Sequence, residues 1–151
     1  MITLDYRLSQ IPSPKEASVD IANPAVDDFT YALFPGDIVF KVDDCDFSAL
    51  WDWIPIVDFA AALRHIVHEL KQTTDGQSVF EFTESEATID FVRDEDVVTI
   101  SASYVSCQAQ VQLNELRTAS DDFSNRVMAG ILQKQPGLKG NSILQQLLTQ
   151  P

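Results

Sequence analysis

The chain has 151 residues, of which 45% are apolar and 22% charged, so it suits one ordinary domain and is too short for two. Its 23 acidic and 10 basic residues give a net charge of −13, which argues against nucleic acids and anionic membranes as direct ligands. The sequence holds no apolar run of about 18 residues and no signal-peptide pattern. We therefore expect a single globular domain over residues 1–151, located in the cytoplasm.

Alternating apolar and polar residues predict two strands near the N-terminus, over residues 4–8 and 38–42. Residues 29–34 predict a short strand between them, and the sequence Pro-Gly-Asp at 35–37 predicts the turn that closes it. The stretch that follows the first strand contains Pro12 and further prolines among polar residues. We expect a long irregular connection there.

The first helix is predicted to begin at Pro55, because proline suits the first helical position, where its missing N–H is not needed. Asp58 near the start and Lys71 near the end complement the helix dipole. Apolar residues recur at intervals of three and four, which predicts one buried face. The residues of this face are Ile56, Phe59, Leu63, Ile66, Val67 and Leu70.

The middle of the chain predicts strands, because apolar residues alternate with polar ones over 80–83, 88–91 and 98–104. From 105 to 113 the alternation continues with the opposite parity. No glycine, proline or asparagine marks a hairpin at the change. We therefore expect one long strand with a β-bulge, which would re-aim the side chains, in place of a tight turn.

The last third of the chain is predicted to be helical. Thr118, with Asp121 three residues later, resembles a capping box, and Pro136 with Gly137 ends that helix. A terminal helix is expected to begin at the cap Asn141. Strands followed by helices indicate the α+β class, with an antiparallel sheet of about five to six strands packed on a central helix and with C-terminal helices.

The sequence lacks the motifs of catalysis and cofactor binding, with neither a G-x-S-x-G nucleophile motif nor a glycine-rich phosphate loop. Cys45 and Cys107 have no metal-ligand spacing, and we expect two free thiols in a reducing compartment. His65 and His68 lie three apart on the predicted helix, a spacing that can bind a metal. They flank the apolar face, however, so we expect surface residues. We expect no catalytic residue, no metal and no cofactor.

Acidic and aromatic residues are concentrated between Asp20 and Asp58. This segment holds nine carboxylates and one basic residue, Lys41, around the run Trp-Asp-Trp at 51–53. Carboxylates steer a basic partner, and large aromatic side chains supply contact energy. A tryptophan at the base of the predicted helix is also suited to the core, and the sequence leaves this open. The candidate partner-binding residues are Asp43, Asp44, Asp46, Trp51, Asp52 and Trp53, of which the first three lie in a predicted loop.

Several stretches of the chain carry a resemblance to known proteins. They are Phe-Pro-Gly-Asp-Ile at 34–38, Phe-Ser-Ala at 47–49 leading into Trp51 and Trp-Ile-Pro at 53–55, Val-Asp-Phe-Ala at 57–60, Phe-Thr-Glu-Ser-Glu-Ala-Thr-Ile at 82–89, and Val-Thr-Ile-Ser-Ala-Ser-Tyr at 98–104. Over roughly residues 30–148 the chain resembles a family of small uncharacterised proteins of actinobacteria, especially streptomycetes. This resemblance implies a domain of unknown function and brings no catalytic residues.

In size, acidity and lack of catalytic motifs the chain is also similar, by type alone, to immunity proteins of bacterial polymorphic toxin systems. Those proteins typically neutralise a nuclease or other basic toxin. The leading hypothesis is therefore a non-enzymatic protein-binding domain that inhibits a basic toxin or another basic protein. Two alternatives stay open: a small structural or regulatory domain without a specific basic partner, and a carboxylate-dependent hydrolase or metal-binding domain. The sequence also leaves open a homodimer in which a second copy covers the sheet.

Overall fold

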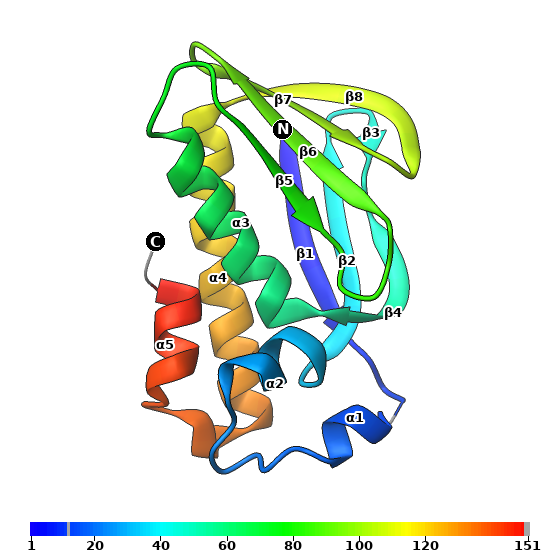
Figure 1. Cartoon of the computed structure of the whole chain (residues 1–151), viewed down its shortest axis with the longest axis vertical. Helices are drawn as coiled ribbons and strands as arrows, with labels where there is room; N and C mark the ends of the chain where they lie inside the picture. Colours follow the sequence, from blue (N-terminus) through cyan, green and yellow to red (C-terminus); the bar gives the residue numbers. More distant parts are fainter. Residues whose placement is uncertain (12, 150–151) are drawn as a thin grey trace.

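Two antiparallel sheets lie against a layer of helices in the computed structural model, which describes residues 1–11 and 13–149 (Figure 1). In the first sheet the central strand β2 (Pro35–Val42) pairs with β1 (Ile2–Leu8) along one side, and with β3 (Cys45–Asp46) and β4 (Ala49–Pro55) along the other. The second sheet is a simple meander of β5 (Gln77–Glu81), β6 (Thr88–Asp94), β7 (Val97–Ala102) and β8 (Val105–Gln112).

Five α-helices complete the described part of the chain and confirm the α+β class. The helical layer consists of α3 (Ile56–Leu70), α4 (Leu113–Lys134) and α5 (Ser142–Thr149), with a short 3₁₀ turn over Pro136–Leu138 between the last two. The short helices α1 (Pro14–Ala17) and α2 (Val26–Tyr31) lie below the first sheet (Figure 1). The structure thus has two four-stranded sheets where the sequence predicted one sheet of five to six strands.

The centre of the core is the apolar face of α3, whose predicted residues are all buried. Phe59 on this face packs edge-to-face on Phe80 of β5 and on Phe123 of α4, with ring centroids 5.1 and 5.8 Å apart. A single aromatic side chain therefore joins the second sheet to the helical layer. Edge-to-face pairs of this kind add to the free energy that burial alone provides.

The strand predicted over residues 29–34 and the turn predicted at 35–37 are both wrong. The segment contains the end of helix α2, because Phe29 and Leu33 are buried four residues apart and Asp28 accepts a hydrogen bond from the Ala25 amide at 2.7 Å. The expected turn at 35–37 is the first part of β2. A Cβ atom on Gly36 would lie 2.0 Å from the Arg7 carbonyl oxygen, so the glycine here permits close approach of two strands. Pro12, part of the expected irregular connection, lies outside the described residues.

The long bulged strand expected over 98–113 is a hairpin, because β7 and β8 pair antiparallel around a turn at Ser103 and Tyr104. The expected capping box is also wrong. Helix α4 begins at Leu113, and the Thr118 hydroxyl donates to the Asn114 carbonyl one turn earlier, inside the helix. The predicted cap of the last helix is confirmed, since the Asn141 side chain accepts from the Leu144 amide at 2.9 Å.

Cys45 and Cys107 form a disulfide, which corrects the expectation of two free thiols. The two residues are 62 positions apart in sequence, but β3 and β8 lie side by side and bring their Cα atoms within 5.8 Å. Side chains at that separation have the geometry that a disulfide needs. The bond therefore ties an edge of the first sheet to an edge of the second.

Reducing this disulfide is expected to lower the free energy of unfolding by about 4 kcal/mol, because the bond closes a loop of 62 residues in the unfolded chain. Urea unfolding of the oxidised chain with and without dithiothreitol measures the change. The Cys45→Ser/Cys107→Ser double variant should match the reduced wild type and should not respond to the reductant. Equal midpoints for oxidised and reduced wild type would contradict the expectation.

Candidate partner-binding site

The site begins with an irregularity in β4. Gly36 pairs with Ile54 and Ile38 pairs with Ala49, so residues 50–53 of β4 stand opposite Asp37 alone. The extra residues cannot stay in the ladder and bulge away from it. Asp52, at the tip, has a φ of 66°, a conformation that aspartate tolerates better than most residues. Its amide donates to the Asp37 carboxylate at 2.9 Å, which holds the bulge in place.

The bulge presents both tryptophans on one side of β4. The rings of Trp51 and Trp53 are stacked, with centroids 5.6 Å apart and an interplanar angle of 22°. Trp51 is half-buried and also contacts Phe82 and Tyr104, at centroid distances of 5.0 and 5.2 Å. Trp53 retains 39% of its accessible surface. One tryptophan therefore belongs largely to the core and supports the other, which faces solvent.

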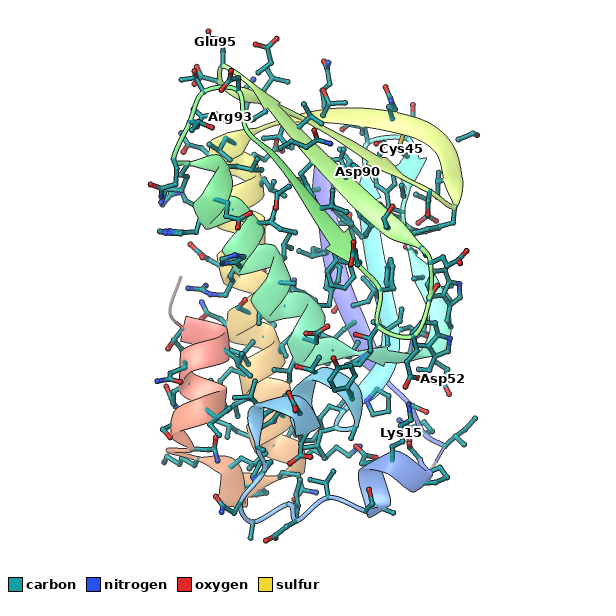
Figure 2. All side chains as sticks on the ribbon, in the orientation of Figure 1. Lys15, Cys45, Asp52, Asp90, Arg93 and Glu95 are labelled. Atoms are coloured by element: carbon teal, nitrogen blue, oxygen red, sulfur yellow. A yellow bond between two sulfur atoms is a disulfide. The ribbon has the colours of Figure 1, made fainter. Side chains whose placement is uncertain are left out.

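A cavity of about 430 Å³ opens beside Trp53. Its walls include Tyr31 at the end of α2, Ile11 and Asp52, and the Asp52 carboxylate accepts a hydrogen bond from the Ser9 hydroxyl at 2.8 Å. Lys15 of α1 forms an ion pair with Glu84 at the rim. Figure 2 shows Lys15 and Asp52 at the same lower corner of the molecule. The cavity thus combines exposed aromatic rings with fixed carboxylates.

Asp46 lies near Tyr104, whose ring contacts Trp51. The Tyr104 hydroxyl donates to the Phe47 carbonyl at 2.6 Å, and burial, with a smaller contribution from the Asp46 charge, raises the pKa of Tyr104 well above its usual range. The Ser48 side chain and amide lower the pKa of Asp46, whose carboxylate accepts from that amide at 2.9 Å. Asp46 is also opposite Lys41 in the β2–β3 ladder. Its charge is therefore fixed in position and partly balanced.

The remaining two predicted residues, Asp43 and Asp44, are both exposed in the turn between β2 and β3. The Asp43 carboxylate contacts the amino group of Met1 at 2.6 Å. Cys45, next in sequence, lies in the upper half of Figure 2, whereas Asp52 lies in the lower half. The structure therefore does not bring all six predicted residues together: the acidic turn and the tryptophan bulge are at different ends of the first sheet.

Sequence reasoning missed three aromatic residues of the site: Phe82 and Tyr104, which contact Trp51, and Tyr31, which lines the cavity beside Trp53. Phe82 directly follows β5, Tyr104 lies in the turn between β7 and β8, and Tyr31 comes from a helix where the sequence predicted a strand. The apolar alternation over 80–83 and 98–104 marks Phe82 and Tyr104 as inward-facing. Nothing in the sequence marks them as neighbours of Trp51.

Other candidate chemistry is sparse in the described residues. Both histidines are exposed, and His65 forms a contact of 2.8 Å with Glu69. Within residues 1–11 and 13–149, no group of three or more His, Cys, Asp or Glu side chains is placed to hold a metal ion.

In the same part of the chain no helix has the length and apolar character needed to cross a membrane. Comparisons with protein-family models, curated proteins and solved structures gave no match.

Asp58 is the one carboxylate whose environment strongly disfavours its charge among the described residues. It lies in the first turn of α3, half-buried, and burial raises its pKa from 3.8 to about 6. The Thr83 hydroxyl, 3.4 Å away, opposes this shift by donating to the carboxylate. A folded-state pKa above the unfolded one means that folding favours the protonated carboxyl.

The Asp58→Asn variant is therefore expected to be more stable than wild type above pH 6, by about 2–3 kcal/mol. Below about pH 3 Asp58 is protonated in both states of the wild type, so the difference should disappear there, and little of it should remain at pH 3.5. It should develop as the pH rises from 4 to 6. Urea unfolding at pH 3.5, 5 and 8 measures it. Asp75→Asn, a change of the same charge at an exposed position, serves as control, and a stabilisation independent of pH would contradict the assignment.

Proposed function

We propose that this chain is a non-enzymatic binding domain for a basic protein, with Trp53 as the central contact. An inhibitor of the immunity type, which neutralises a basic toxin, is the form of this function that we favour. The observation that carries the proposal is the exposed Trp53 ring, held on Trp51 beside a cavity that also contains the Asp52 carboxylate.

The rigidity of the tryptophan platform, formed by the stacked rings of Trp51 and Trp53, supports this proposal. Trp51 is fixed from below by Phe82, which is 3% exposed, so Trp53 has little freedom to lose when a partner binds. Tryptophans in such settings are frequent hot spots, whose truncation costs 2 kcal/mol or more of binding free energy. Pre-organised aromatic side chains also avoid the entropic cost of ordering a flexible loop.

Charge supports the choice of a basic partner. The chain has a net charge of −13, and Asp52 lies next to Trp53 with its carboxylate oriented by Ser9. The long-range field attracts a cationic surface, and a carboxylate beside an aromatic ring suits an arginine or lysine side chain. On this proposal the acidic turn at 43–46 contributes to attraction over distance, and the tryptophan platform makes the contact.

The Trp53→Ala variant is expected to lose at least about thirtyfold in affinity for the partner, mainly through faster dissociation. A basic protein encoded in the neighbouring reading frame is the first partner to test by surface plasmon resonance. Asp52→Asn should instead slow association, and wild-type association should slow steeply with added salt.

Val79→Ala on β5 is the matched control, because Val79 is an apolar side chain with 41% exposure, close to that of Trp53. This variant should bind as wild type does. If Trp53→Ala binds as tightly as Val79→Ala, the platform is not the contact. If association is independent of salt, the electrostatic part of the proposal fails, and the acidity serves solubility alone.

A further inference from the structure

Asp52 places a carboxylate without a counter-charge in the wall of the cavity beside Trp53. The residue is half-buried, and within residues 1–11 and 13–149 it forms no ion pair. Its Oδ2 accepts the hydrogen bond of the Ser9 hydroxyl, whereas its Oδ1 has no hydrogen-bond donor in that part of the chain. The Oδ1 atom also keeps access to solvent. A half-buried carboxylate with one open acceptor atom is suited to a cationic donor from another molecule.

Two aromatic rings border this carboxylate. Trp51 covers one face of Trp53, so the surface that Trp53 keeps lies on the other face and on the ring edge. Tyr31, which is 53% exposed, lines the same cavity. Among the described residues no lysine or arginine lies over either of these rings. The electron-rich face of a tryptophan attracts a cation, so the ring and the carboxylate are open to the same ligand.

The other two charges of the cavity wall balance each other. Lys15 of α1 pairs with Glu84 at the rim, which leaves Asp52 as the uncompensated charge (Figure 2). Asp52 and Glu84 both have a left-handed backbone, with φ of 66° and 62°. Such conformations are costly and cluster at functional sites, where a side chain is held in one position. The wall therefore presents a fixed, unpaired negative charge next to the Trp53 ring.

The hydrogen-bonding capacity of the ligand selects among cations. A quaternary ammonium ion would stack on Trp53 but would leave the Asp52 Oδ1 without a donor. A lysine ammonium would donate to Oδ1, but it is compact and strongly hydrated. A guanidinium does both, because its planar group stacks on an aromatic ring and carries several N–H donors in that plane. The cavity volume of about 430 Å³ admits an arginine side chain in full.

We propose that this cavity receives one arginine side chain of the basic partner, with its guanidinium against Trp53 and hydrogen-bonded to Asp52. The inference rests on the function proposed above, and it names the side chain that the partner presents. Lys15 opposes this binding, because its own charge repels the arginine and neutralises Glu84 at the rim. The chain thus carries an internal competitor for its own binding site.

The test is a ¹H–¹⁵N NMR titration of the full chain with N-acetyl-arginine amide at constant ionic strength. N-acetyl-lysine amide and tetramethylammonium chloride are the competing probes, and N-acetyl-norleucine amide is the uncharged control. The arginine probe should shift the Trp53 indole N–H resonance and the Asp52 amide in a saturable manner, with a dissociation constant of about 1 mM. It should bind at least about tenfold more tightly than the other probes. No saturable shift, or binding of lysine or tetramethylammonium as tight as that of arginine, would overturn the proposal.

Variants locate the arginine within the cavity. Asp52→Asn should weaken binding of the arginine probe about tenfold, because asparagine tolerates the same backbone and can still accept from Ser9 but lacks the charge. Lys15→Gln should strengthen binding severalfold, an effect that general damage to the fold would not produce. Asp75→Asn and Lys139→Gln make the same charge changes at exposed positions outside the cavity and should leave binding unchanged. Equal affinities in all four variants would overturn the placement.

The same measurements separate this inference from the proposed function. If Trp53→Ala weakens binding of the basic partner while the arginine probe does not saturate, the proposed function stands and the arginine proposal is overturned. If the probe saturates in a manner that depends on Asp52 but no basic protein binds, the arginine site stands and the proposed function fails.

Discussion

The burial of α3 is the constraint on which the other features of this fold depend. Its apolar face lies against the second sheet, α4 and α5, and Phe59 contacts aromatic rings from two of these elements. Because β4 runs into α3 without a loop, the position of the helix also fixes the end of β4. Residues 50–53 must then bulge between a strand pairing at Ala49 and a helix start at Ile56. The tryptophan platform follows from this confinement.

The elements that the sequence predicts correctly are those whose pattern is strong and local. The buried face of α3 and the strands β1 and β2 follow from the spacing of the apolar residues within each element, whichever elements they pack against. The β7–β8 hairpin could not be predicted in the same way, because Ser103 and Tyr104 are not typical turn residues. Their turn is imposed by the ladder from Val97 with Gln112 to Ser101 with Gln108. Only the pairing of β7 with β8 distinguishes this hairpin from a bulged strand. That pairing cannot be seen in a short stretch of sequence.

The candidate site was predictable only in part, again because the local sequence does not show which segments meet in the fold. The composition of the segment around Trp53 identifies an acidic and aromatic surface, and the structure does place Trp53 in solvent. Proximity in sequence, however, grouped Asp43 and Asp44 with the tryptophans, whereas the course from β3 into β4 carries them apart. The disulfide shows the converse, since Cys45 and Cys107 meet only because two hairpins from different sheets lie together.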